Sequence, residues 1–223
     1  MPVTWSALPT AWRGEGDVPR IEYVVLAAGA SLRMGFAKAT APLAGASPLA
    51  RLGRILGGRS VTIVTTQALV EECSRTFPGA RVLVNATPEA GMTSSLVVAH
   101  RALAPDLTLG VLLADKPFVR EETLVLCEGA YQAEPACDVL FPTLAGERGH
   151  PVYFGPRARA RLAAAPSGDT LRAVRDDPEL KAVAVECVDP GVVVDLDTPV
   201  EWHEAERRLA GEPAPERESG LHA

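Results

Sequence analysis

Residues 21–38 read IEYVVLAAGASLRMGFAK, an apolar run that leads directly into a turn of small residues containing two cations, Arg33 and Lys38. An apolar run with little alternation predicts a strand buried on both faces over 21–27. Strands of this kind belong to parallel sheets, which bind ligands beyond the carboxyl ends of their strands. The stretch therefore predicts an α/β fold with a ligand site at residues 28–38.

The rest of the chain repeats this pattern of strand and helix. Further apolar runs predict strands at 61–66, 81–85, 109–114, 181–187 and 191–196. Apolar residues spaced three or four apart predict helices at 48–56, 67–77, 92–103, 119–133, 156–164, after Gly168, and at 198–209. The segment 137–154 is typical of a hairpin or a reversed strand, which predicts a mixed edge to the sheet. We expect a three-layer α/β/α, Rossmann-like fold around a mostly parallel, mixed sheet.

One folded domain suits a chain of 223 residues, 47% of them hydrophobic. We place it at 21–210, because residues 1–20 and 211–223 are rich in proline, glycine and charge and predict a flexible arm and a disordered tail. No run of about 18 apolar residues predicts a membrane span, and the first twenty residues lack the apolar core of a signal peptide. We expect a cytoplasmic protein.

Charge and cysteine content argue against two other classes of protein. The net charge is −6, which disfavours nucleic-acid binding through phosphate neutralisation. The four cysteines, Cys73, Cys127, Cys137 and Cys187, form no CxxC pair. This spacing predicts buried thiols and no structural zinc site.

The turn at 28–38 has the chemistry of a triphosphate site. Small residues let main-chain amides approach a polyanion, and Arg33 and Lys38 can neutralise phosphate charge. Five residues separate Gly29 from Gly35, and Lys38 does not follow the second glycine directly, so the turn is neither a P-loop nor a GxGxxG loop. From the residues alone, a small-residue turn with two solvated cations is an equally good interpretation.

Five motifs in order resemble those of a known family. They are LAAGASLRMGFAK at 26–38, GMTSSL at 91–96, LLADKP at 112–117, RGHPV at 148–152 and DLDTP at 195–199. Together they resemble the nucleotidyltransferases that join a nucleoside triphosphate to a phosphorylated acceptor, above all the molybdenum cofactor cytidylyltransferases. The resemblance covers nearly all of the expected domain. It implies a nucleotide-diphospho-sugar transferase-like fold and Mg²⁺-dependent nucleotidyl transfer that releases pyrophosphate.

The resemblance assigns the metal to Asp115 and Asp197. Asp115 follows the predicted strand at 109–114, so its carboxylate is expected at the same sheet edge as the glycine loop. Asp195 and Asp197 lie two residues apart in a segment predicted to be extended, so their side chains would share one face. The resemblance makes Asp197 the metal ligand, whereas Asp195 would support the site without binding the metal. Carboxylate oxygens are suitable ligands for Mg²⁺. The alternative for Asp115 and for Asp197 is a cap on the helix that follows.

The same resemblance assigns the nucleotide. It implies nucleotide contacts from Leu26, Ala27, Ala28, Gly29, Gly91 and Ser95, with Arg33 and Lys38 as the catalytic cations. Relatives with alanine at the position of Ala28 are cytidylyltransferases, whereas glycine there marks guanylyltransferases. CTP is therefore expected over GTP. For the segment 91–96, ordinary capping of a helix by serine or threonine is the alternative.

His150 is implied on the acceptor side, where it would donate to a pterin or a phosphate, although a packed histidine is an equal alternative. The expected acceptor is molybdopterin, with a molybdoenzyme as client. The sequence departs from the family pattern at two places: Lys116 stands where the residue is often neutral, and the segment 167–172 lacks the glycine usually found two residues past Asp169. A sugar- or alcohol-phosphate nucleotidyltransferase and a non-catalytic cofactor carrier are the alternatives.

Overall fold

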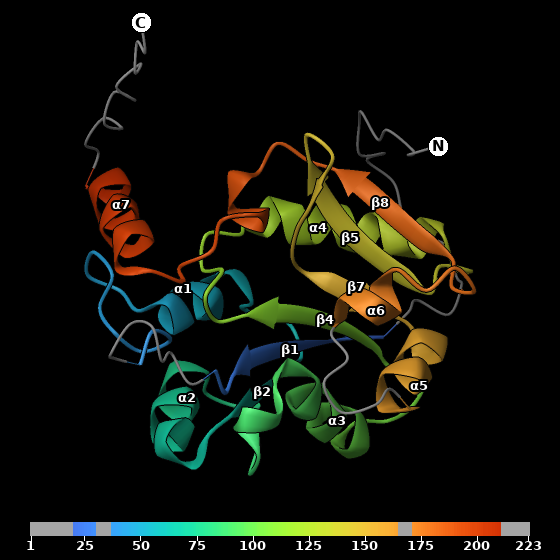
Figure 1. Cartoon of the computed structure of the whole chain (residues 1–223), viewed down its shortest axis with the longest axis horizontal. Coiled ribbons are helices and arrows are strands. Elements are labelled where there is room, and N and C mark those ends of the chain that lie inside the picture. The colour runs from blue at the N-terminus through green and yellow to red at the C-terminus, as the bar shows by residue number, and fades with distance from the viewer. Residues whose placement is uncertain (1–19, 30–36, 165–170, 211–223) are drawn as a thin grey trace, which may run out of the picture.

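A mixed sheet crosses the centre of the computed structural model, which describes residues 20–29, 37–164 and 171–210 (Figure 1). In this part of the chain the strands are β1 (Ile21–Ala27), β2 (Val61–Thr65), β3 (Arg81–Val84), β4 (Thr108–Leu113), β5 (Val139–Leu144), β6 (Glu147–Arg148), β7 (Val152–Phe154) and β8 (Ala182–Glu186). Their order is β3-β2-β1-β4-β7-β5-β6, and β8 also pairs with β5. The expected arm before residue 20, the expected tail, Arg33 and Asp169 lie outside the described residues.

The helices lie where the apolar spacing predicts them. They are α1 (Pro48–Ile55), α2 (Val70–Thr76), α3 (Met92–Ala102), α4 (Glu121–Ala133), α5 (Pro156–Ala164), α6 (Leu171–Arg175) and α7 (Pro199–Leu209), with 3₁₀ turns η1 (Gln67–Leu69), η2 (Pro88–Ala90) and η3 (Pro190–Val192). Within the described ranges, no helix combines the length and the apolar character needed to cross a membrane.

Alternate side chains of β1 enter two separate hydrophobic cores. Tyr23, Val25 and Ala27 pack with residues of α1, α2 and α4, whereas Val24 and Leu26 pack with residues of α3, α5 and α6. A strand with helices against both faces buries both sets of side chains, which explains the unbroken apolar run. The three-layer α/β/α prediction is confirmed.

The reversed strand predicted within 137–154 is β7, which pairs antiparallel with β4 and with β5. It lies inside the sheet, between those two strands, whereas the sequence indicated only a mixed edge. Val152, Tyr153 and Phe154 are all buried, as an interior position requires. Because β5 returns to the direction of β4 and pairs parallel with β8, the sheet remains mostly parallel.

The prediction of a strand at 191–196 is wrong. Proline and glycine open the segment as the turn η3, and none of these residues joins the sheet. Gly191 lies against the main chain of Phe118, because a Cβ atom added at Gly191 would be 2.0 Å from the Phe118 carbonyl oxygen. The apolar run is therefore buried against a loop, and this packing brings Asp195 and Asp197 toward the end of β4.

Candidate active site

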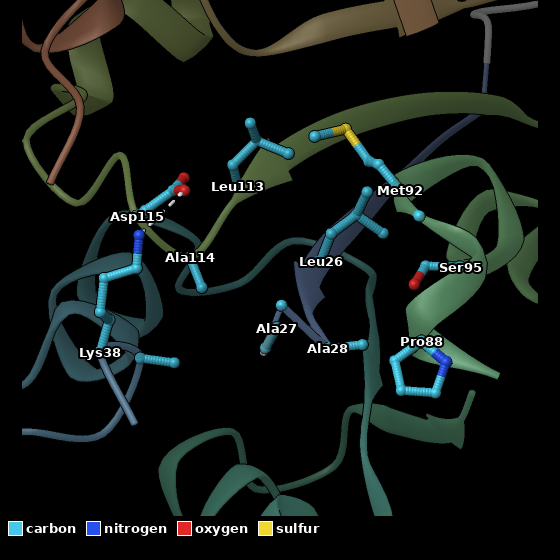
Figure 2. Close-up of a pocket in the computed structure, with 13 residues that line it drawn as sticks. Leu26, Ala27, Ala28, Lys38, Pro88, Met92, Ser95, Leu113, Ala114 and Asp115 are labelled. Atoms are coloured by element: carbon cyan, nitrogen blue, oxygen red, sulfur yellow. Dashed lines mark ion pairs between the residues drawn. The ribbon is translucent and has the colours of Figure 1, made fainter. Parts of the chain in front are cut away.

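A cleft of about 320 Å³ opens beyond the carboxyl ends of β1 and β4 (Figure 2). Its lining includes all of the nucleotide contacts implied by the motifs, namely Leu26, Ala27, Ala28, Gly29, Gly91 and Ser95. In Figure 2, Lys38 and Asp115 lie on one side of the cleft, and Ser95, Met92 and Pro88 lie on the other. The cleft therefore has a charged end and a largely uncharged end.

Small residues form the floor between these two ends. The Ala114 N–H donates to the Leu26 carbonyl at 3.1 Å, which ties the end of β1 to the end of β4. Ala27 and Ala28 expose only 3% and 4% of their surface, and no atom lies within 4 Å of a Cβ atom added at Gly29. A ligand can therefore approach the main chain closely at this turn, as a polyphosphate site requires.

Two carboxylates meet at the charged end. The Lys38 Nζ lies 2.7 Å from Asp197 Oδ1 and 3.7 Å from Asp115 Oδ2. Asp115 Oδ1 is buried and has no hydrogen-bond partner among the described residues. The structure thus brings Asp115 and Asp197 together around the ammonium of Lys38.

The main chain explains the convergence. The Leu196 N–H donates to the Asp115 carbonyl at 3.1 Å, and the Leu196 side chain is buried against Leu43 and Trp202. Asp197 follows directly and is thereby held beside Asp115. The positions of the two carboxylates are thus fixed by backbone bonding and apolar packing.

Neither carboxylate caps a helix, although capping was the alternative for both. The N-cap of α7 is Thr198, which forms a capping box with Glu201, and Asp197 contributes only its main-chain N–H to Glu201. The N-cap position of α4 is Arg120, five residues beyond Asp115. Neither carboxylate is therefore committed to a helix terminus; Asp115 lines the cleft, and Asp197 lies next to it through its contact with Lys38.

Burial raises the pKa of the Asp115 carboxyl above its ordinary value, and the nearby charge of Asp197 raises it further, whereas Lys38 opposes the shift. A second positive charge at this point would stabilise both ionised carboxylates. The two carboxylates at this point are therefore only partly neutralised by Lys38.

The donor set fits a hard divalent cation that binds together with phosphate. Mg²⁺ is commonly held by one or two carboxylates plus water and substrate phosphates. Among the described residues, no group of three or more histidine, cysteine or acidic side chains could hold a metal ion. Side chains of these types therefore supply only part of a metal's coordination sphere here. The unpartnered Asp115 Oδ1 and the Asp197 carboxylate match the share that a protein contributes to such a site.

Asn85 organises the uncharged end, and the motifs did not indicate it. Its side-chain amide donates to Ser94 Oγ at 2.7 Å and to Ser95 Oγ at 2.9 Å, while its Oδ1 accepts from the Thr87 N–H at 3.0 Å. The N-cap of α3 is Gly91, and no side chain caps the helix, so the capping alternative fails. A polar residue directly after a strand, at the sheet edge where ligands bind, was the available signal for Asn85.

The remaining predicted residues lie beyond the charged end. The Lys116 Nζ pairs with Asp195 Oδ1 at 2.5 Å, so Asp195 and Asp197 take different lysines. His150 does not line the cleft, and its Nδ1 lies 3.4 Å from the Val111 carbonyl. Burial, with the charge of Lys116, lowers the pKa of His150 to about 4. His150 is therefore neutral at neutral pH.

Residues 23–183 match the family model of the MobA-like NTP transferase domain. The solved structure of Rv0371c from Mycobacterium tuberculosis H37Rv is 25% identical with a TM-score of 0.66, over 87% of this chain and 100% of that chain. A complex of Rv0371c with manganese is 22% identical with a TM-score of 0.64, over 84% of this chain and 98% of that chain. No functionally curated protein matches the sequence.

Two further solved structures share the fold at lower identity. Molybdopterin-guanine dinucleotide biosynthesis protein A from Archaeoglobus fulgidus is 19% identical with a TM-score of 0.65, over 85% of this chain and 99% of that chain. CMP:2-keto-3-deoxy-manno-octonic acid synthetase, solved with CTP, is 14% identical with a TM-score of 0.66, over 86% of this chain and 99% of that chain. The shared architecture is the nucleotide-diphospho-sugar transferase fold. With its family match over most of the folded region, the chain belongs to the MobA-like NTP transferase domain family of nucleotidyltransferases.

Proposed function

We propose that the protein transfers a cytidylyl group from CTP to a phosphorylated acceptor of the molybdopterin class, with Mg²⁺ held by Asp115 and Asp197, in the cytoplasm. The observation that carries the proposal is the convergence of these two carboxylates on the Lys38 ammonium at the end of the cleft. The acceptor class rests on the motifs and on the name of the Archaeoglobus fulgidus neighbour. A molybdoenzyme would be the client.

The reaction forms one bond and breaks one bond. An acceptor phosphate oxygen attacks the α-phosphorus of CTP in line, and pyrophosphate leaves. A phosphate near neutral pH is already a nucleophile, so alignment and charge stabilisation suffice and no general base is required. The divalent cation would neutralise charge on the nonbridging oxygens.

Residues of the chain would bind the phosphates and align the reactants. Lys38 would hold the phosphates with its ammonium, together with Arg33 from the same motif. The main chain at 26–29 would lie along the triphosphate, where the small side chains leave room. Asp115 and Asp197 would hold the cation at the charged end, which would align the acceptor phosphate with the α-phosphorus of CTP.

The choice of CTP over GTP rests on Ala28. Its side chain lines the cleft and lies toward Pro88 in Figure 2, on the side away from Lys38 and Asp115. A methyl group at this place narrows the space for a base, which favours a pyrimidine over a purine. Ser95, held by Asn85, offers a hydroxyl at the same end.

Pyrophosphate release measured with CTP and with GTP, each with Mg²⁺, tests the proposal over a panel of acceptors. Molybdopterin, a sugar phosphate and an alcohol phosphate represent the acceptor classes. We expect release with CTP and molybdopterin, and a loss of about 10²-fold or more in Asp115→Ala and in Asp197→Ala. Asp106→Ala is the matched control, because Asp106 pairs with Arg20 at the amino end of β4.

Each contrary result points to a different error. Faster release with GTP overturns the base assignment, and a sugar phosphate that outperforms molybdopterin overturns the acceptor class. Tight binding of molybdopterin without pyrophosphate release indicates a cofactor carrier. Full turnover in the Asp115 and Asp197 variants means that the site is misplaced.

A further inference from the structure

Asp189 is a buried carboxylate outside the cleft, and 3% of its surface is exposed. Its Oδ2 accepts from the Arg120 N–H at 2.8 Å and from Thr123 Oγ1 at 2.7 Å, while its Oδ1 accepts from the Gly191 N–H at 2.9 Å. The Arg120 side chain adds an ion pair at 3.7 Å. Both oxygens are thus used to join the start of α4 to the turn η3.

The joined segments are in direct contact. Gly191 lies so close to the Phe118 main chain that a Cβ atom would be 2.0 Å from the carbonyl oxygen. On the other side of the turn, the His150 N–H donates to the Val192 carbonyl at 3.0 Å. The turn η3 is therefore held between the loop that leaves β4 and the loop that precedes β7.

From this turn the chain runs beside residues 115–120 to Asp197. The Lys116 Nζ contacts Asp195 at 2.5 Å and lies 3.5 Å from the Val193 carbonyl, and the Leu196 N–H reaches the Asp115 carbonyl. Because the segment is no strand, no ladder of sheet hydrogen bonds fixes its register. Its place depends on these contacts and on the packing of Leu196 against Leu43 and Trp202, with Asp189 at one end and Asp197 at the other.

We propose that Asp189 is a positioning residue of the catalytic centre, which holds the 190–197 segment against the loop after β4 so that Asp197 lies beside Asp115. This inference rests on the proposed function, since it concerns the two carboxylates of the metal site. Asp189 contacts no reacting atom and acts through the backbone between itself and Asp197. Its removal leaves the buried donors of Thr123 and Gly191 and the part-buried N–H of Arg120 without their acceptor, and it loosens the segment.

The predicted signature is a loss of metal affinity in a protein that remains folded. Groups that support the ligands of a metal site commonly change affinity or activity by about 10- to 100-fold when mutated. Asp189→Ala should therefore weaken Mn²⁺ binding by about 10-fold or more. Asp189→Asn, which keeps one accepting oxygen, should show a smaller loss, and added metal should restore much of the turnover of both variants.

The experiment titrates Mn²⁺ by electron paramagnetic resonance in the presence of α,β-methylene-CTP, at a temperature well below each variant's Tm. Asp138→Asn is the matched control, because Asp138 is a largely buried carboxylate that accepts from the Lys181 N–H at 2.9 Å, before β5. Thr123→Val removes a single donor to Asp189 and serves as a milder variant should the others fail to fold.

Weaker Mn²⁺ binding in the Asp189 or Thr123 variants, with unchanged binding in Asp138→Asn, supports the inference. Unchanged Mn²⁺ affinity in those variants overturns it and leaves the proposed function intact. An equal loss in Asp138→Asn also overturns it, because the effect would then be one of general stability. Absence of Mn²⁺ binding by the unmutated protein overturns the proposed function itself, and the inference with it.

Discussion

Lys38 is the residue on which the charged end of the cleft depends. Its ammonium lies between Asp197 and Asp115, at 2.7 and 3.7 Å, where it offsets part of their mutual repulsion. A divalent cation and this ammonium would compete for the same carboxylate oxygens. Binding of a triphosphate gives the ammonium another partner, so metal and nucleotide are expected to bind together.

Replacing Lys38 by methionine should therefore separate two effects. Without nucleotide, Mn²⁺ should bind about 10-fold more tightly, because one competing charge is removed. Turnover should fall by about 10²-fold or more, because a phosphate ligand is lost. Titration of Mn²⁺ and steady-state kinetics measure the two quantities.

Lys116→Met is the matched control for this change, since Lys116 is an ion-paired lysine next to Asp115 in the chain but pairs with Asp195. Lys116 also contacts the 190–197 segment that carries Asp197, so its loss should leave Mn²⁺ affinity unchanged or lower it, in contrast to the tightening expected of Lys38→Met. Equal tightening in both variants would show that overall charge, and not competition at the carboxylates, controls metal binding.

His150 should make the stability of the protein depend on pH. Burial lowers its pKa to about 4 in the folded state, whereas an unfolded histidine titrates near about 6.5. Between these values the unfolded chain takes up a proton that the folded protein does not, so folding loses stability as pH falls through this window. The full loss amounts to about 3 kcal/mol.

Urea denaturation at pH 7.5 and at pH 4.5 tests this expectation with His150→Gln. The variant should lose about 2–3 kcal/mol less between the two pH values than the unmutated protein does. His203→Gln, which changes an exposed histidine of α7, should leave the pH dependence as it is. Parallel pH dependence in His150→Gln and the unmutated protein contradicts the assignment of a half-buried histidine that is neutral in the folded state.

At the scale of elements, α5 is anchored by a fully buried arginine. Arg159 donates from Nη1 to the Ala104 and Leu107 carbonyls, both at 2.6 Å, and from Nη2 to the Leu103 carbonyl at 3.4 Å. These carbonyls belong to the loop between α3 and β4. Arg159 thus ties one layer of helices to the entry of a central strand.

Arg159→Met should lower the free energy of unfolding by about 2 kcal/mol or more, because buried carbonyls lose charged donors. Mn²⁺ affinity and turnover should stay near their original values, since α5 does not line the cleft. Arg157→Met, at an exposed position of the same helix, should cost about 1 kcal/mol at most. Comparable destabilisation by both changes would contradict a special role for Arg159.

The same helix shows what sequence patterns can and cannot predict. Apolar spacing predicted α5 correctly, yet a charged residue within it gave no sign of being buried, because its partners are carbonyls more than fifty residues away. The prediction of a strand at 191–196 was wrong for a related reason. Its apolar run signalled burial, but whether a buried segment joins a sheet or packs on a loop depends on distant neighbours such as Phe118.

At the scale of the whole molecule, the parallel strands determine where the site lies. β1 and β4 end at one edge of the sheet and place Gly29 and Asp115 in the lining of a single cleft. This part was predictable, because alternating strands and helices fix which ends coincide. The placement of β7 inside the sheet and the path of the 190–197 segment were not, since both arise from long-range pairing.

The central claim is that Asp115 and Asp197 share one divalent cation with the triphosphate in this cleft. Anomalous diffraction from crystals grown with Mn²⁺ and α,β-methylene-CTP measures this directly. The account predicts a single manganese peak bonded to oxygens of both carboxylates, with the Lys38 ammonium moved onto a phosphate. A manganese peak remote from either carboxylate, or a nucleotide bound outside the cleft between Ser95 and Asp115, would contradict it.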